Sequence, residues 1–200
     1  MTTKSVTTSA SPVLPTTGSG APLPLAALPQ GELLTVDIDQ IPMFKDLGGP
    51  GIHIQPLRLD LEKGEWVILA TLAPGCELPL HYHTGTAEVW TIQGRWEYKE
   101  YPGQPQTAGS YLYEPGGSTH TFFCPEDNTE DTITLAWIQG AQVSFNEDGT
   151  FHSLFDAVGI TYLVEAASVA QGLAAIPYIR GAVADFNGGD GANVNGARKP

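Results

Sequence analysis

Short segments in which apolar and polar residues alternate recur from about residue 33 to residue 155. Because successive side chains of a strand point to opposite faces of a sheet, this alternation predicts strands that each bury one face. About nine short strands with no helix between them indicate an all-β sandwich or barrel. The predicted strands are residues 33–38, 52–59, 66–72, 88–92, 95–101, 110–113, 132–138, 141–145 and 150–154.

Two local features refine this prediction. Pro56 lies inside the segment 52–59, and proline cannot donate a backbone hydrogen bond, so this strand is expected at a sheet edge or with a bulge. Asp148 and Gly149 separate the last two predicted strands and are typical of a tight hairpin turn.

The pattern changes after the last predicted strand. Residues 155–171 are predicted to be helical, with Gly172 as the end of the helix, and residues 179–186 as a second short helix. We therefore expect four parts: a Thr/Ser/Pro-rich disordered tail over 1–30, a barrel over 31–155, a helical segment over 156–186 and a disordered tail over 187–200.

Composition limits the partners of this chain. Its 22 acidic and 9 basic residues give a net charge of −13, which disfavours nucleic acid and anionic membranes. No segment approaches the ~20 apolar residues of a membrane helix. Pro24 interrupts the apolar run 23–28, so we see no secretory signal and expect a cytoplasmic protein with neither a nucleic-acid nor a membrane partner.

A pair of histidines suggests a metal site. His81 and His83 are two residues apart, so on a strand both side chains point to the same face. Neutral imidazole is a ligand for Zn, Cu, Fe and Ni. A third histidine, His120, follows 37 residues after His83, behind a Glu114-Pro115 turn.

These two segments resemble the paired motifs of the cupin superfamily, G-x5-H-x-H-x3/4-E-x6-G and G-x5-P-x-G-x2-H-x3-N. The first motif is matched by Gly75, His81, His83 and Gly94, and the second by Gly109, Pro115, Gly117 and His120. The resemblance implies a double-stranded β-helix, that is, a jelly-roll barrel. It also implies that His81, His83 and His120 bind one metal ion.

The acidic ligand of the cupin motif has no clear counterpart here. Counting back from Gly94 leads to Ala87, whereas counting forward from His83 leads to Glu88. A shift of one residue turns a strand side chain to the other face. Residues 84–86 form a bend of variable length, so we count from Gly94 and place Ala87 inside the barrel and Glu88 outside. Glu88 as a fourth ligand is the alternative.

Among cupins, the chain is similar to the three-histidine dioxygenases that cleave C–C bonds, such as 2,4'-dihydroxyacetophenone dioxygenases and acetylacetone-cleaving enzymes. The segments Gly109–Thr121 and Gly94–Tyr98 carry this resemblance. It implies a non-haem Fe(II) enzyme, with Zn or Ni as other ions, that cleaves an aryl α-hydroxyketone with dioxygen. Alternatives are a β-diketone dioxygenase, another cupin enzyme and a non-catalytic zinc sensor. We also expect a homo-oligomer, a dimer or a tetramer.

Glu114 is the candidate catalytic residue. As a carboxylate near the third histidine, it would orient an imidazole N–H or accept a proton from the substrate. The alternative is an exposed acid at the turn before Pro115.

The remaining chemically notable residues have simpler interpretations. Cys76 and Cys124 are interpreted as two small buried thiols, with a disulfide or a metal-bound thiolate as alternatives. His53 and His152 are expected to have surface or structural roles. Five aromatic residues are expected to line a pocket or to belong to the core: Trp90, Trp96, Tyr98, Tyr111 and Tyr113.

Overall fold

The computed structural model describes residues 16–22, 34–173 and 176–181. Contacts divide the chain into two units, Met1–Thr35 and Val36–Pro200. In the first unit, a turn is closed by an antiparallel bridge between Thr16 and Pro22. The prediction of disordered tails concerns residues that mostly lie outside the described ranges.

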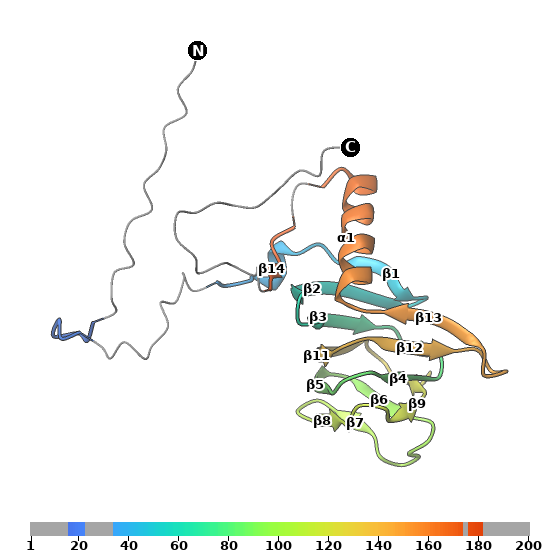
Figure 1. Ribbon diagram of the computed structural model, residues 1–200. Helices are drawn as coiled ribbons and strands as arrows, with labels where there is room; N and C mark the ends of the chain where they lie inside the picture. The colour runs from blue at the N-terminus through green and yellow to red at the C-terminus, as the bar shows by residue number, and fades with distance from the viewer. Residues whose placement is uncertain (1–15, 23–33, 174–175, 182–200) are drawn as a thin grey trace. The chain divides into compact units, whose positions relative to one another are not determined.

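The second unit is a mostly-β jelly roll with one C-terminal α-helix, as predicted (Figure 1). Its helical elements are η1 (Ile38–Gln40, a 3₁₀-helix) and α1 (Ala157–Gln171). Its strands are β1 (Phe44–Gly49), β2 (Ile52–Asp60), β3 (Glu65–Leu72), β4 (His81–His83), β5 (Ala87–Gln93), β6 (Arg95–Tyr98), β7 (Gln106–Thr107), β8 (Tyr111–Glu114), β9 (Thr119–His120), β10 (Phe122–Phe123), β11 (Thr132–Gln139), β12 (Gln142–Phe145), β13 (Phe151–Phe155) and β14 (Ile179–Arg180).

The strands form three sheets. The largest has the order β1-β2-β3-β11-β5-β8, with β14 beside β2. The second has the order β13-β12-β4-β9 and the third β10-β6-β7. Figure 1 shows the strands stacked one above another, with α1 at the end that carries β1 and β13.

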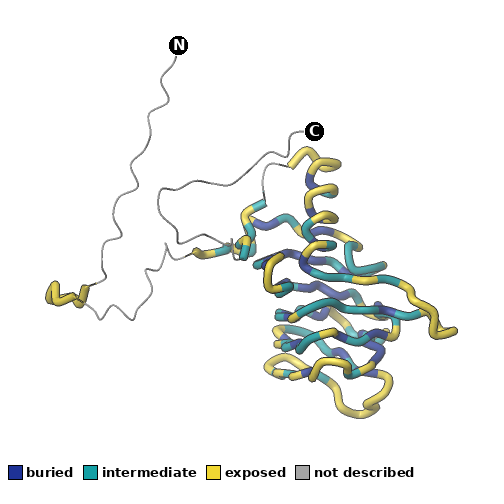
Figure 2. Tube along the Cα trace, in the orientation of Figure 1, coloured by how far each residue is buried: buried dark blue, intermediate teal, exposed yellow. Residues whose placement is uncertain are grey.

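Strand β11 shows how the alternating pattern builds the core. It buries every second residue, and it pairs with β3 along its full length and with β5 on its other side. Figure 2 shows the buried residues concentrated within the strands. Burying a large apolar side chain contributes about 1.5–3 kcal/mol. The core includes Phe44, Ile52, Ile54, Leu59, Trp66, Ile68, Leu72, Trp96, Phe122, Ile138, Ile160 and Val164.

Both local refinements of the strand pattern are confirmed. The register between β2 and β3 shifts between Pro56 and Arg58, so the proline sits at a bulge within a paired strand. Strands β12 and β13 form the predicted antiparallel hairpin. Its turn is closed by the backbone N–H of Asn146, which donates to the carbonyl of Thr150 at 2.9 Å.

Helix α1 begins two residues later than predicted and ends, as predicted, at Gly172. The Asp156 carboxylate caps its first turn by accepting a hydrogen bond from the Gly159 N–H at 2.7 Å. Gly172 ends the helix in the left-handed conformation, with φ of 64°. The buried residues of α1 lie three or four apart and face the barrel: Ala157, Ile160, Val164 and Ser168. No described helix has the length and apolar character needed to span a membrane.

Two predicted elements are wrong. The described part of 33–38 contains no strand, because the Asp37 carboxylate accepts from the Asp39 N–H and caps the 3₁₀-helix η1 instead. The described part of 179–186 contains the strand β14 rather than a helix. β14 runs parallel to β2 opposite Arg58 and Leu59, beyond the residues of β2 that β1 pairs with. The rest of that segment lies outside the described residues.

Candidate metal centre

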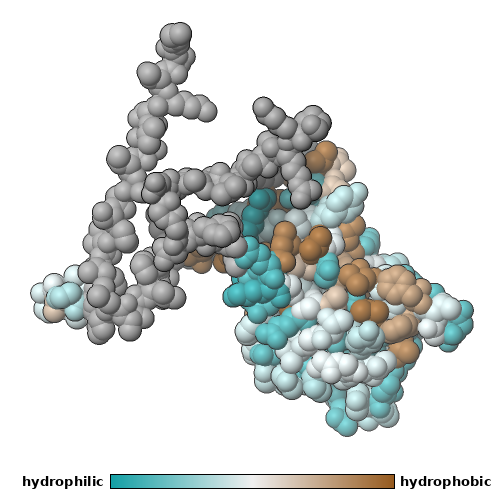
Figure 3. All heavy atoms as spheres, viewed as in Figure 1, coloured by the Kyte–Doolittle hydropathy of each residue, from teal (hydrophilic) through white to brown (hydrophobic). Residues whose placement is uncertain are grey.

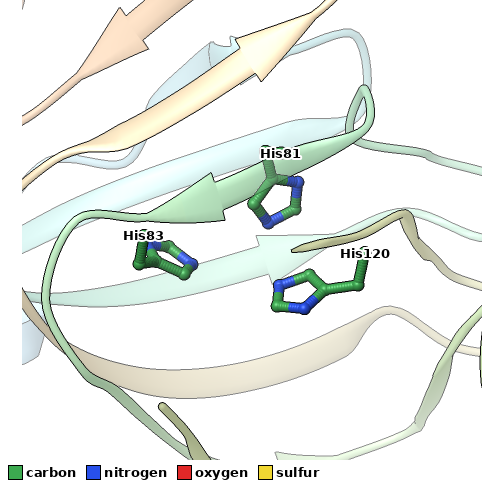
Figure 4. Close-up of side chains that lie close together, drawn as sticks. All are labelled: His81, His83 and His120. Carbon is green, nitrogen blue, oxygen red and sulfur yellow. The ribbon is translucent and has the colours of Figure 1, made fainter. Parts of the chain in front are cut away.

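Three histidines converge inside the barrel. His81 and His83 lie on β4 and His120 on β9, and the pairing of these strands sets His81 directly opposite His120. The side chains of β4 alternate, so both histidines point inward while Tyr82 points outward. Candidate ligand atoms of the three side chains lie within 4.8 Å of one another. Figure 4 shows the three rings turned toward a common point.

The surroundings bury all three imidazoles, orient the ring of His81 and favour the neutral form of His81 and His83. The three residues are only 2%, 6% and 1% exposed. The Nδ1 atom of His81 lies 2.8 Å from the carbonyl of Pro79, a hydrogen bond that leaves Nε2 as the ligand atom. Burial lowers the pKa of His81 to about 4 and also lowers the pKa of His83. Neutral imidazole is the form that binds a metal.

The positions of Ala87 and Glu88 agree with the count from Gly94. Ala87 is buried and lines the interior. Glu88 points to the outer face of β5, where its carboxylate accepts a hydrogen bond from the Tyr111 hydroxyl at 3.0 Å. Glu88 is therefore not part of the histidine cluster.

Glu114 brings a carboxylate into the cluster from another strand. It lies on β8 directly opposite Ala87 and is 5% exposed, so the interpretation as an exposed acid is wrong. Its Oε2 atom is 3.3 Å from Nε2 of His83 and 3.2 Å from Nε2 of His120. The other oxygen, Oε1, accepts a hydrogen bond from the hydroxyl of Tyr98.

The charge state of Glu114 follows from these neighbours. Burial favours the neutral acid, but the imidazoles of His120 and His83 and the Tyr98 hydroxyl favour the carboxylate more, so the pKa of Glu114 lies below its ordinary value. Burial and the adjacent carboxylate raise the pKa of Tyr98 well above its ordinary value, which keeps this phenol protonated as a donor. The cluster thus holds one anion, the carboxylate of Glu114.

Several polar atoms at this point have no partner in hydrogen-bonding geometry within the described part of the chain, although Oε2 of Glu114 and Nε2 of His120 lie 3.2 Å apart. They are Nδ1 of His83, Nε2 of His120 and Oε2 of Glu114. A buried polar atom without a partner costs about 1–3 kcal/mol. A divalent transition-metal ion bound by three imidazole nitrogens would remove part of this cost and offset the carboxylate charge. The residues therefore fit a metal ion.

An apolar cavity of about 460 Å³ opens onto this cluster. This volume is within the range of ligand-binding pockets, about 300–1,000 Å³. His81, His83 and Glu114 contribute polar atoms at the cluster end. The apolar part of the wall includes Ile52, Ile54, Trp66, Ile68, Leu72, Val89, Phe122, Ile138 and Leu163.

Residues 32–142, more than half of the chain, match the family described as the ChrR cupin-like domain. The chain belongs to this cupin family. No curated protein matches it.

Solved structures agree with this assignment. A cupin-like protein of unknown function from Ralstonia eutropha is 46% identical, with 80% of this chain and 98% of that chain covered and a TM-score of 0.73. An RmlC-like cupin from the same organism is 25% identical over 70% of this chain and 89% of its own, with a TM-score of 0.66. An acetylacetone dioxygenase from Acinetobacter johnsonii is 18% identical over 68% and 93%, with a TM-score of 0.58, a likeness of fold.

The aromatic residues of this cupin divide between its interior and its surface. Trp96 and Tyr98 line the cavity, as expected, and the Tyr98 ring stacks on His120 with centroids 4.0 Å apart. Trp90, Tyr111 and Tyr113 are exposed on the outer face of β5 and β8, so they belong neither to a pocket nor to the core. The strand alternation that turns Ala87 and Glu114 inward turns these rings outward.

The two cysteines are free and buried, as predicted. The Cys124 N–H donates to the Cys76 carbonyl at 2.9 Å, and the thiols are hydrogen-bonded neighbours. Neither belongs to the histidine cluster. His53 has a structural role, because its Nδ1 accepts from the Asp46 N–H at 3.1 Å. His152 is exposed at the wall of the cavity.

Two polar residues that face this site were missed in the sequence. Gln142 and Ser144 lie on β12 directly opposite His83 and His81. They are two residues apart, so their shared face was readable once the strand was predicted. Nothing in the sequence, however, indicates that β12 pairs with β4.

Proposed function

We propose that this cupin is a non-haem iron dioxygenase that cleaves the C–C bond next to the carbonyl group of an aryl α-hydroxyketone. The observation that carries the proposal is a buried set of three histidines with Ala87 in place of an inward acid, next to an apolar cavity. The likeness of fold to acetylacetone dioxygenases supports it.

The ligand set determines what this site accepts. Three imidazole ligands add no negative charge to a divalent ion, so a net positive charge remains beside the single carboxylate of Glu114, which favours an anionic, chelating oxygen ligand. Iron(II) held by His81, His83 and His120 would supply Lewis-acid polarisation of the substrate oxygens and activation of dioxygen.

In this proposal, Glu114 accepts the proton of the substrate hydroxyl, and Tyr98 positions Glu114. The carboxylate of Glu114 faces the point on which the histidines converge, and Tyr98 holds it through a hydrogen bond. It is thus placed to accept the proton that the substrate hydroxyl loses when the substrate binds as an anion. A general base must be within hydrogen-bond reach of the proton that it accepts, and a substrate that binds at the histidines would bring its hydroxyl group next to this carboxylate.

The apolar wall serves the rest of the substrate. It holds an aryl group and excludes water, which strengthens electrostatic interactions at the cluster. The overall reaction is balanced: an α-hydroxyketone and one dioxygen give two carboxylic acids, with the C–C bond between the carbonyl and hydroxyl carbons broken and one oxygen atom added to each carbon.

Oxygen uptake by iron-loaded protein tests the proposal. The protein is loaded with Fe(II) without air and supplied with 2-hydroxyacetophenone or, separately, acetylacetone. We expect uptake with the α-hydroxyketone, and loss of both iron and uptake in His81→Ala, His83→Ala and His120→Ala. Uptake with acetylacetone alone would make the protein a β-diketone dioxygenase, and no uptake with either would refute the dioxygenase.

A non-catalytic zinc-binding cupin is the second candidate. The same ligand set favours it, because three imidazoles suit zinc as well as iron. Elemental analysis of the purified protein separates the two functions. Stoichiometric zinc together with inactive iron-loaded protein would support the zinc-binding function.

A further inference from the structure

Strand β12 places two polar side chains beside the histidines. Gln142 lies opposite His83 and Ser144 opposite His81 in the antiparallel pairing of β12 with β4. Residues directly opposite in such a pair point to the same face of the sheet, with Cβ atoms about 4.5–5.5 Å apart. Both side chains therefore line the cavity next to two candidate ligands.

These two side chains have hydrogen-bonding capacity left over. The Gln142 Nε2 atom donates to the Ser144 Oγ at 3.3 Å, and Ser144 is 2% exposed. This is the one side-chain hydrogen bond recorded for either group in the described part of the chain. The Ser144 hydroxyl proton and the Gln142 Oε1 atom are then available to a ligand in the cavity.

We propose that Gln142 and Ser144 hydrogen-bond the hydroxyketone group of the substrate before its hydroxyl loses the proton, and thereby select an aryl hydroxyketone among carbonyl compounds. This inference rests on the proposed function. A site built to hydrogen-bond a hydroxyl group discriminates strongly against an analogue that lacks it, since the polar groups of the site are then left unpaired.

Away from the metal ion of the proposed function, the charges of the cavity wall favour uncharged groups on the substrate. No lysine or arginine belongs to the described wall, and its two carboxylates are Glu114 and, at the exposed edge, Asp46. A substrate that already carries a carboxylate or phosphate would find no cationic side chain here. Hydroxyl and carbonyl oxygens match a serine hydroxyl and a neutral amide.

The size of the cavity favours an aryl group. At about 30 Å³ per water-sized atom, the cavity of about 460 Å³ holds roughly 15 non-hydrogen atoms. On the same scale, acetylacetone, with about seven such atoms, would fill less than half of it. A phenyl ring carrying a two-carbon hydroxyketone, about ten atoms, fills it better.

Binding to zinc-loaded protein tests this assignment without turnover, because zinc has no redox chemistry. Isothermal titration calorimetry compares 2-hydroxyacetophenone with acetophenone, which lacks the hydroxyl group. In Gln142→Leu and Ser144→Ala we expect the affinity for 2-hydroxyacetophenone to fall about ten-fold, while the affinity for acetophenone stays within about two-fold. Metal content and thermal denaturation show that each variant is folded and loaded.

Gln104→Leu is the matched control, because Gln104 is exposed and lies outside the cavity. If Gln142→Leu does not fold, Gln142→Asn withdraws the amide by one methylene and is expected to weaken binding in the same way. The inference would be overturned if the variants lost the same affinity for both probes, or if they bound 2-hydroxyacetophenone as tightly as the wild type does. It would also be overturned if the wild type did not bind 2-hydroxyacetophenone. If the zinc-loaded protein showed the expected preference for 2-hydroxyacetophenone but the iron-loaded protein took up no oxygen, only the proposed function would be overturned.

Discussion

Ala87 and Glu114 face each other across β5 and β8. The small side chain at position 87 leaves room beside the histidines, and the carboxylate of Glu114 reaches within 3.2–3.3 Å of two imidazole nitrogens. An acid thus remains at the cluster although the inward position of β5 carries none. It comes from β8, and Tyr98 on β6 holds it.

Glu114→Gln tests the role of this carboxylate. The amide keeps the shape of the side chain but cannot accept the substrate proton. We expect iron content to be retained and oxygen uptake with 2-hydroxyacetophenone to fall about 10–100-fold, the usual range for residues that support a metal site. Glu88→Gln, the same change on the outer face of β5, is the control and should leave uptake unchanged. Equal uptake by the two variants would remove Glu114 from the mechanism.

The candidate ligands were predictable from the sequence because spacing alone defines them. His81 and His83 share a face on any strand, and the glycines and proline around them carry the cupin motif. Glu114 was named as a candidate, but its burial depended on the pairing of β8 with β5. Gln142 and Ser144 were missed because their place at the site depends on the pairing of β12 with β4. A local sequence pattern does not predict which distant strands pair.

At the scale of elements, alternation predicted the regular strands and failed where backbone geometry is irregular. β1 was missed because its sequence holds two glycines, and Asp46 has a positive φ of 57°. The wrong strand at 33–38 reflects the Asp37 cap, a side-chain interaction that competes with strand pairing. β14 is only two residues long, so its sequence is too short to show an alternating pattern. It is a strand because it pairs with β2.

Gly94 links β5 to β6 and belongs to the first cupin motif. Replacing it with alanine tests why this position carries glycine. Its φ is 76°, and a Cβ atom there would lie 2.5 Å from Oγ1 and 2.7 Å from Cα of Thr132. Gly94→Ala should therefore combine backbone strain of about 1–2 kcal/mol with overpacking of about 1–3 kcal/mol. Each kcal/mol lowers Tm by roughly 2–4 °C in a protein of this size.

Gly103→Ala is the matched control for this substitution. Its φ is 77°, yet nothing lies within 4 Å of the position of the added Cβ atom. Only the backbone strain should remain, so thermal denaturation should show a clearly smaller loss than for Gly94→Ala. The same Tm for both variants would show that contact with Thr132 does not matter.

The barrel as a whole brings the two large sheets together at the cluster. The histidines lie in the sheet of β13-β12-β4-β9, whereas Glu114 lies in the sheet that ends with β8. Figure 3 shows patches of apolar surface on the side of the molecule that carries α1 and β13. The exposed large apolar side chains of these two elements include Phe151, Leu154 and Val158. Cytoplasmic location and a homo-oligomeric state, a dimer or a tetramer, stay predictions.

Metal removal should lower the stability of the whole barrel. A ligand that binds only the folded state at about 100 times its Kd contributes about 2.7 kcal/mol, which is roughly 5–11 °C in Tm. We expect a chelator to lower Tm by this amount and added iron to restore it. In His120→Ala, Tm should respond to neither treatment. A wild-type Tm that is indifferent to chelator would argue against a metal site at the histidines.

The most direct test of the dioxygenase is the fate of labelled dioxygen. Iron-loaded protein is given 2-hydroxyacetophenone under ¹⁸O₂, and the products are analysed by mass spectrometry. The proposed reaction predicts benzoic acid and formic acid in equal amounts, each with one ¹⁸O atom from dioxygen. Uncleaved substrate, or acids that carry no label, would contradict it.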